Sequence, residues 1–110
     1  MDPLGGSRKN VLQAVRLYRL AAEQGHAQAQ CWLGSMFFSG TGVAQDDAEA
    51  ARLFSLAAAQ GYRRAQFNLG NMFECGKGVA QDRAEAIRWY RLAAAQGHAQ
   101  AKTNLKRLGA

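Results

Sequence analysis

The sequence predicts an all-helical repeat protein, a solenoid of stacked helix pairs, and three observations support this fold class. Glycine recurs every 36 residues, at Gly25, Gly61 and Gly97, and other residues follow the same period. Helix start and stop signals recur in the same register. The only proline, Pro3, stands near the N-terminus, so no proline interrupts the repeat. Repeats of this length usually hold two helices and stack on their neighbours, so we expect one domain of about six helices.

One helix type begins at a recurring capping signal. Asn10, Asp46 and Asp82 are each followed three residues later by Gln or Glu. In such a capping box the first side chain accepts a hydrogen bond from the backbone, and the second one bonds back. We expect these capped helices to start near residues 11, 47 and 83 and to end at the three repeated glycines, which can close a helix in the left-handed conformation. Residues 1–9 are then expected to be a flexible tail.

The other helix type, called the LG helices after its Leu-Gly pairs, is expected at residues 27–39, 63–75 and 99–108. Gly34 and Gly70 lie inside these helices, where glycine costs about 1 kcal/mol relative to alanine. We expect the following capped helix to approach closely there. In the third copy Lys106 takes this position, which indicates a terminal capping helix.

The predicted domain therefore covers residues 10–110. It consists of a half repeat at 10–25, full repeats at 26–61 and 62–97, and the terminal capping helix at 98–110. Apolar residues four, seven and eight positions apart in the LG helices indicate a buried stripe along each of them.

Composition and charge restrict the function. No apolar run approaches the roughly 20 residues of a membrane span, and the first ten residues lack the apolar stretch of a signal peptide, so we expect no membrane insertion. The net charge of +6 permits an acidic partner. The basic residues are scattered and no aromatic residues alternate with them, which disfavours nucleic acid. Cys31 and Cys75 occupy different repeat positions and are expected to be free thiols, which favours a reducing compartment such as the cytoplasm and leaves the localisation open.

The sequence predicts neither an enzyme nor a cofactor site. His26 and His98 lie two repeats apart, too far to share a metal ion. Glu74 and Cys75 are neighbours in a helix, so their side chains point in different directions. No nucleophile with a nearby base is apparent.

Two long strings carry a family resemblance. AQCWLGSMFFSGTGVAQD and AQFNLGNMFECGKGVAQD, each followed by an alanine-rich segment that ends in Gln-Gly, resemble Sel-one-like repeats, a branch of the tetratricopeptide-type helical repeats. The resemblance covers nearly the whole chain. It implies a right-handed α/α superhelix of antiparallel helix pairs and a role as an adaptor or scaffold, often bacterial. It also implies a ligand groove lined by the LG helices. Some secreted members join each repeat by a cysteine pair, which this chain lacks.

The positions of the LG helices that differ between the copies share one face, because they are spaced by three, four, seven and ten residues. The candidate groove residues are Gln28, Cys31, Trp32, Ser35 and Phe38 in the first copy, Arg64, Phe67, Asn68 and Asn71 in the second, and Gln100, Thr103, Asn104 and Arg107 in the third. The aromatic ones are expected to form an apolar floor and the polar ones to bind a peptide backbone or a carboxylate. Alternatively, these positions vary because they face water or pack in the core.

The resemblance also implies a role for one position within this face. Asn68 and Asn104 match an asparagine that commonly grips a peptide in tetratricopeptide grooves, whereas Trp32 departs from it and puts a strict carboxylate clamp in doubt.

Three functions remain in order. The first is a protein-interaction module that binds a protein or peptide in the groove. The alternative is a structural unit that associates with itself through the solenoid ends, so a homo-oligomer stays open. The third is a weak binder of nucleic acid or another acidic partner.

Overall fold

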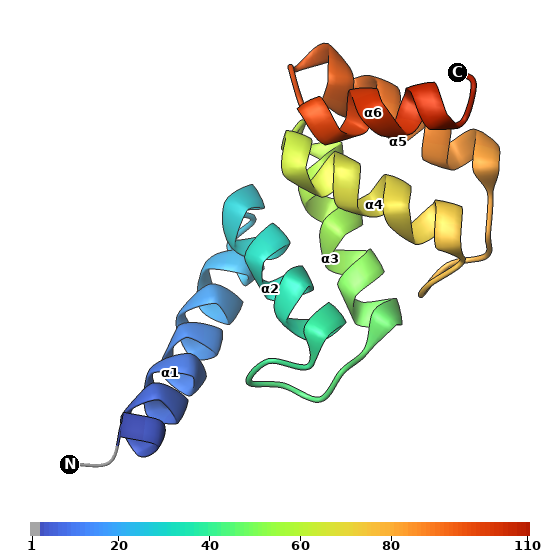
Figure 1. Cartoon of the computed structure of the whole chain (residues 1–110). Coiled ribbons are helices and arrows are strands. Elements are labelled where there is room, and N and C mark those ends of the chain that lie inside the picture. Colours follow the sequence, from blue (N-terminus) through green and yellow to red (C-terminus); the bar gives the residue numbers. More distant parts are fainter. Residues whose placement is uncertain (1–2) are drawn as a thin grey trace.

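The structure is a computed structural model that describes the backbone of residues 3–110 and the side chains from Lys9 onward. Six helices and no strand make up this part of the chain. They are α1 (Pro3–Glu23), α2 (Ala27–Ser39), α3 (Asp47–Ala59), α4 (Arg63–Cys75), α5 (Arg83–Ala95) and α6 (Ala99–Arg107). Each helix packs on the next in chain order, which gives an elongated body of 52 × 24 × 24 Å with the termini at opposite ends (Figure 1). The predicted all-α solenoid is confirmed, with α2, α4 and α6 as the LG helices.

The local signals explain where the helices begin. Asp46 Oδ1 accepts a hydrogen bond from the Glu49 amide at 3.1 Å, and the equivalent pair at the start of α5 does the same. The second half of the predicted capping box does not form, because the Glu49 carboxylate pairs with Arg52 at 2.6 Å instead. An arginine three residues further along the helix offers a charge-assisted bond on the same face, which competes with the backbone amide.

The start of α1 differs from the prediction. The capping signal at Asn10 predicted a helix from residue 11, but α1 begins at Pro3, so residues 3–9 are helical rather than a flexible tail. Residues 1 and 2, the rest of the predicted tail, lie outside the described residues. Proline suits a first helical position, because its ring fixes φ near the helical value and its missing amide hydrogen would have no partner there. Asn10 therefore lies inside the helix and caps nothing.

Glycine inside the LG helices allows the helix pairs to pack closely, as predicted. A Cβ atom added at Gly34 would lie 2.8 Å from the ring of Phe54, and one added at Gly70 would lie 2.6 Å from the ring of Tyr90. Both separations are shorter than a carbon–carbon van der Waals contact. The aromatic ring of each capped helix thus occupies the space that a side chain on the LG helix would need.

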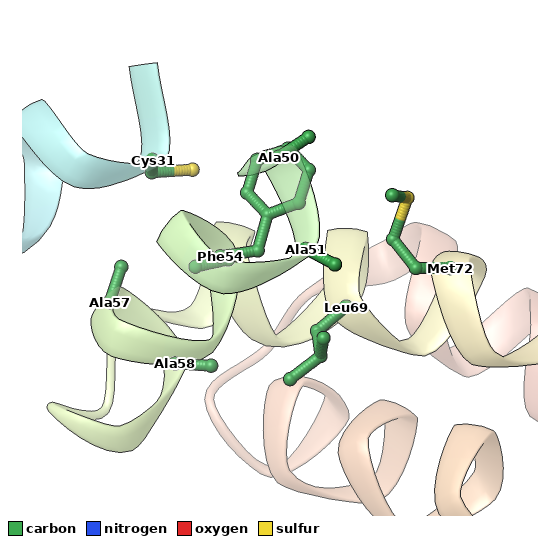
Figure 2. Close-up of a cluster of buried hydrophobic side chains, with 9 residues drawn as sticks. Cys31, Ala50, Ala51, Phe54, Ala57, Ala58, Leu69 and Met72 are labelled. Atoms are coloured by element: carbon green, nitrogen blue, oxygen red, sulfur yellow. The ribbon is translucent and has the colours of Figure 1, made fainter. Parts of the chain in front are cut away.

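The central core lies between α2, α3 and α4 (Figure 2). Phe54 of α3 is 3% exposed and lies among four alanines of its own helix, Cys31 of α2, and Leu69 and Met72 of α4. The alanines keep α3 thin, so both neighbouring LG helices reach the same ring. Packing of this density places the exposed faces of α2 and α4 next to each other.

A ladder of glutamines joins successive repeats. Gln30, 4% exposed, donates from Nε2 to the Ala22 carbonyl at 3.2 Å and accepts at Oε1 from Gln60 Nε2 at 2.8 Å. Gln66 makes the equivalent two bonds one repeat later. Because buried amides are costly unless they are hydrogen-bonded, this glutamine ladder satisfies both residues and fixes each helix-ending turn to the next.

Candidate functional site

Side chains of α2, α3 and α4 surround a hollow of about 130 Å³ on the face that carries the candidate residues. Its lining consists of three apolar residues, Phe38, Phe54 and Met72, and three polar ones, Ser35, Asn68 and Asn71. We call it the α2–α4 hollow. Four of the candidate groove residues therefore meet there, around an apolar floor.

The corresponding place between α4 and α6 is filled by a polar network. The Tyr90 hydroxyl lies 2.6 Å from Asn71 Oδ1 and 2.7 Å from Glu74 Oε1. Asn104 Nδ2 donates to Asn71 Oδ1 at 3.4 Å, and Arg107 donates to both oxygens of Glu74, at 2.7 and 2.6 Å. We call these five residues the Glu74 network. Its members bond to one another, so the predicted role of Asn104 and Arg107 as donors to a ligand finds no support in this geometry.

The hollow and the network occupy equivalent positions one repeat apart. In steps of 36 residues, Ser35 corresponds to Asn71, Phe38 to Glu74, Phe54 to Tyr90, Asn68 to Asn104, Asn71 to Arg107 and Met72 to Leu108. The first layer therefore lacks the hydroxyl, the carboxylate and the guanidinium that close the second. The same backbone arrangement is closed in one layer and open in the other.

The polar atoms at the rim of the hollow are available to a ligand. Across the described part of the chain, no hydrogen bond engages the Ser35 hydroxyl, and the Asn71 side chain uses its oxygen but not its amide nitrogen. Asn68 Nδ2 makes only a long contact of 3.8 Å to Cys31 Sγ. The rim can therefore both donate to and accept from a peptide backbone.

Electrostatics stabilise the Glu74 network. Burial acts to raise the pKa of the Glu74 carboxyl, but hydrogen bonds from Tyr90 and Arg107 outweigh it and hold this pKa below its ordinary value of 4.5. Burial and the neighbouring Glu74 raise the pKa of the Tyr90 hydroxyl, so Tyr90 stays protonated and can donate.

Glu74→Gln is expected to weaken the dependence of stability on acid. The Glu74 pKa is lower in the folded than in the unfolded chain, so the stabilisation is complete above the unfolded value of about 4.3 and is lost as the pH falls through the folded value. Urea unfolding at pH 7 and about pH 3 should show a smaller loss of unfolding free energy in Glu74→Gln than in wild type. Glu23→Gln, on the exposed face of α1, is the matched control and should follow wild type. Equal losses in Glu74→Gln and wild type would contradict the network.

Two candidate residues turn out to be packed inside. Cys31 is 2% exposed and lies in the central core, and burial raises its thiol pKa to about 11, so it presents no group to a partner. The Phe67 ring stacks on His98, with 4.5 Å between the ring centroids, and lies 5.8 Å from the Tyr90 ring. Phe67 therefore packs with the C-terminal layer and does not belong to the predicted floor. The helix-wheel angle that selected both residues points between the neighbouring helices.

The remaining candidates lie beside the hollow or away from it. Trp32 is 43% exposed, with the Tyr18 ring stacked on it at 6.3 Å and the Arg64 guanidinium 5.8 Å from its centroid. Gln28 lines a shallow depression together with Trp32. Gln100 and Thr103 are exposed on α6 and do not line the hollow.

Sequence reasoning missed four residues of this face. Phe54 and Met72 were assigned to the core alone, although they also form the floor of the hollow. Tyr90 and Lys77 were not candidates, although Tyr90 organises the Glu74 network and Lys77 Nζ lies 5.5 Å from the Phe38 ring centroid. A signal was present, since Phe54 and Tyr90 differ by one hydroxyl at equivalent positions.

Other kinds of site receive no support from the described residues. In that part of the chain, no three His, Cys, Asp or Glu side chains lie close enough together to hold a metal ion. Cys31 and Cys75 are both free, as predicted. None of the helices described here is both long and apolar enough to cross a membrane.

The repeat can now be compared with known families. The family model of the Sel1 repeat matches residues 3–26, 27–62 and 63–98. The chain belongs to the Sel1 repeat family. Sel1 repeat proteins are helical scaffolds, generally non-enzymatic, that act as protein-interaction modules. The three matched segments each begin close to the start of an LG helix or, for the first, of α1.

Solved structures of Sel1 repeat proteins share this fold. The Sel1 repeat protein from Oxalobacter formigenes is 43% identical, with a TM-score of 0.83 over 84% of this chain and 70% of that one. The antigen c5321 of uropathogenic Escherichia coli, described as displaying an SLR fold, is 41% identical with a TM-score of 0.84, over 86% of this chain but only 20% of that one. Helicobacter pylori cysteine rich protein B is 24% identical, with a TM-score of 0.78 over 83% of this chain and 68% of that one, and shows the fold alone. None of the curated proteins matches the chain.

Proposed function

We propose that this Sel1 repeat protein is a protein-interaction module that holds a segment of a partner protein against the LG helices, with the α2–α4 hollow as the anchor point. The observation that carries the proposal is the contrast between the two layers. The position that the Glu74 network fills in one layer is an apolar hollow with unoccupied polar atoms at its rim in the other. An apolar pocket surrounded by a few polar groups is typical of the anchor points of protein interfaces.

Binding through this hollow involves no bond making or breaking. Its polar groups are a hydroxyl and two carboxamides, none of which has a base beside it that would make it a nucleophile. The proposed role is therefore recognition alone, in keeping with the generally non-enzymatic family.

A matched pair of substitutions tests the anchor point. Ser35→Phe would fill the hollow, whereas Ser39→Phe introduces the same ring on the same helix at an exposed position outside it. Both variants are first checked for unchanged melting. In affinity capture from a lysate of the source organism, a partner should be retained by wild type and Ser39→Phe and lost by Ser35→Phe. Equal retention by all three would place the binding surface elsewhere.

A second candidate, association between two copies, is favoured by one observation at α1. Leu17 is 58% exposed, whereas Leu53, its equivalent in α3, is 2% exposed against α2. Head-to-tail arrays are disfavoured, because Lys106 replaces the glycine that lets a capped helix approach. A pair of α1 faces is the remaining arrangement. Light scattering over a range of concentrations would show a mass that stays monomeric in Leu17→Lys but not in wild type if this candidate is right.

A further inference from the structure

Two cations bracket the α2–α4 hollow. At one end the Arg64 guanidinium lies 5.8 Å from the centroid of the Trp32 ring, and at the other Lys77 Nζ lies 5.5 Å from that of Phe38. Both rings remain about two fifths exposed. Each end of the hollow therefore presents a positive charge beside an accessible aromatic surface.

Neither cation is neutralised by the described residues. The ion pairs of that part of the chain join Arg52 to Glu49, Arg88 to Glu85 and Arg107 to Glu74. Glu74, the acid on this face, already binds Arg107 and the Tyr90 hydroxyl. Helix α2 itself carries no acidic or basic residue. The hollow thus lies in a region of unbalanced positive charge, which attracts an acidic ligand.

The spacing of the two cations limits the length of the ligand. Trp32 and Phe38 are six residues apart on one helix, which corresponds to about 9 Å along its axis. An extended peptide covers that distance in about three residues. Acidic side chains one or two positions before and after a central residue would therefore reach both cations.

The hollow itself selects for an apolar central residue. Its floor is formed by Phe38, Phe54 and Met72, and it lacks the hydroxyl and guanidinium that hold a carboxylate in the Glu74 network. An apolar cavity of about 150 Å³ accommodates benzene, so the volume of about 130 Å³ found here suits one leucine-sized side chain.

From these observations we propose the ligand class: an extended acidic peptide segment with one aliphatic side chain seated in the α2–α4 hollow and carboxylates on both sides of it held by Arg64 and Lys77. This inference rests on the proposed function, because it names the ligand of the same site. The rim residues Ser35, Asn68 and Asn71 would bind the peptide backbone between the two cations.

Labelled peptides, blocked at both ends, test the ligand class by fluorescence anisotropy. SEELEES should bind at least about tenfold more tightly than SKKLKKS, which lacks the acids, and than SEEGEES, which lacks the aliphatic anchor. Its affinity should fall several-fold when the salt is raised to about 0.5 M, because the cations are exposed. The neutral peptide SSSLSSS should bind weakly but measurably.

Paired charge variants supply the control. Arg64→Gln with Lys77→Gln should abolish the preference for SEELEES over SSSLSSS, whereas Arg91→Gln with Lys102→Gln, which removes two exposed cations away from the hollow, should leave it intact. Equal affinities of wild type for the acidic and basic peptides, or saturation by none of them, would overturn the ligand class. Tighter binding of an unlabelled single-stranded oligonucleotide than of SEELEES would overturn it in favour of nucleic acid.

The failure of the ligand class can be distinguished from the failure of the proposed function. If Ser35→Phe removes binding of SSSLSSS while the charge preference is absent, the hollow is the anchor point and only the acidic character is wrong. If Ser35→Phe leaves the binding of every peptide unchanged, the hollow itself is not the site.

Discussion

Gly70→Arg is expected to lower the free energy of unfolding by about 3 kcal/mol, the upper end of the cost of overpacking a core. Even a Cβ atom at this position would lie 2.6 Å from the ring of Tyr90, and the ring is fully buried and cannot move aside. The α4–α5 pair would have to separate, and the contacts of both helices with their neighbours would be lost. Urea unfolding followed by circular dichroism measures the effect.

The chain offers a matched control at the equivalent position of α6. Lys106 already carries a long basic side chain there, and no capped helix follows it among the described residues. Lys106→Arg should therefore leave the free energy of unfolding unchanged. Gly70→Ala gives the sharpest contradiction: a rise in its melting temperature, which helix propensity alone would produce at about 1 kcal/mol, would refute the packing argument.

Tyr90→Leu is expected to destabilise the protein by a similar amount, about 3 kcal/mol. The substitution leaves a cavity beside Gly70, where the ring is 0% exposed. It also removes the hydroxyl that lies within hydrogen-bonding distance of Asn71 and Glu74, both of which remain partly buried. The two losses add to each other, since one is apolar packing and the other is polar satisfaction.

Tyr18→Leu is the matched control for this prediction, because Tyr18 holds the same repeat position in α1. Its ring is only half-buried and contacts Trp32 rather than a helix of the next layer. We expect a loss below about 1 kcal/mol, measured by the same urea titration. Equal losses for the two tyrosines would mean that repeat position alone, and not the layer around it, determines the cost.

Much of the fold could be predicted because its signals are local and repeat. The bounds of α2 to α6 follow from aspartate caps, closing glycines and apolar spacing, all of which act within a few residues of a helix end. The start of α1 could not be predicted in this way, since the pattern at Asn10 is a cap only if the chain before it is not helical. A helix that already runs from Pro3 makes the same residues interior ones.

The candidate site was predicted less completely, because it depends on contacts between repeats. A helix wheel places Cys31 and Phe67 on the variable face but does not say that neighbouring helices cover them. The Glu74 network joins residues up to 33 positions apart, beyond any local pattern. Comparison of the copies would have revealed it, since Phe54, Phe38 and Asn71 change together to Tyr90, Glu74 and Arg107.

Lys106 has a consequence for how such a chain can be lengthened. A further copy of residues 62–97 inserted after Gly97 would bring its own glycine, its own capping aspartate and its own glutamine for the ladder, and would leave α6 in last place. The same copy appended after Ala110 would have to dock its capped helix on Lys106. The architecture is therefore extensible from within and closed at its C-terminal end, and one side chain determines the difference.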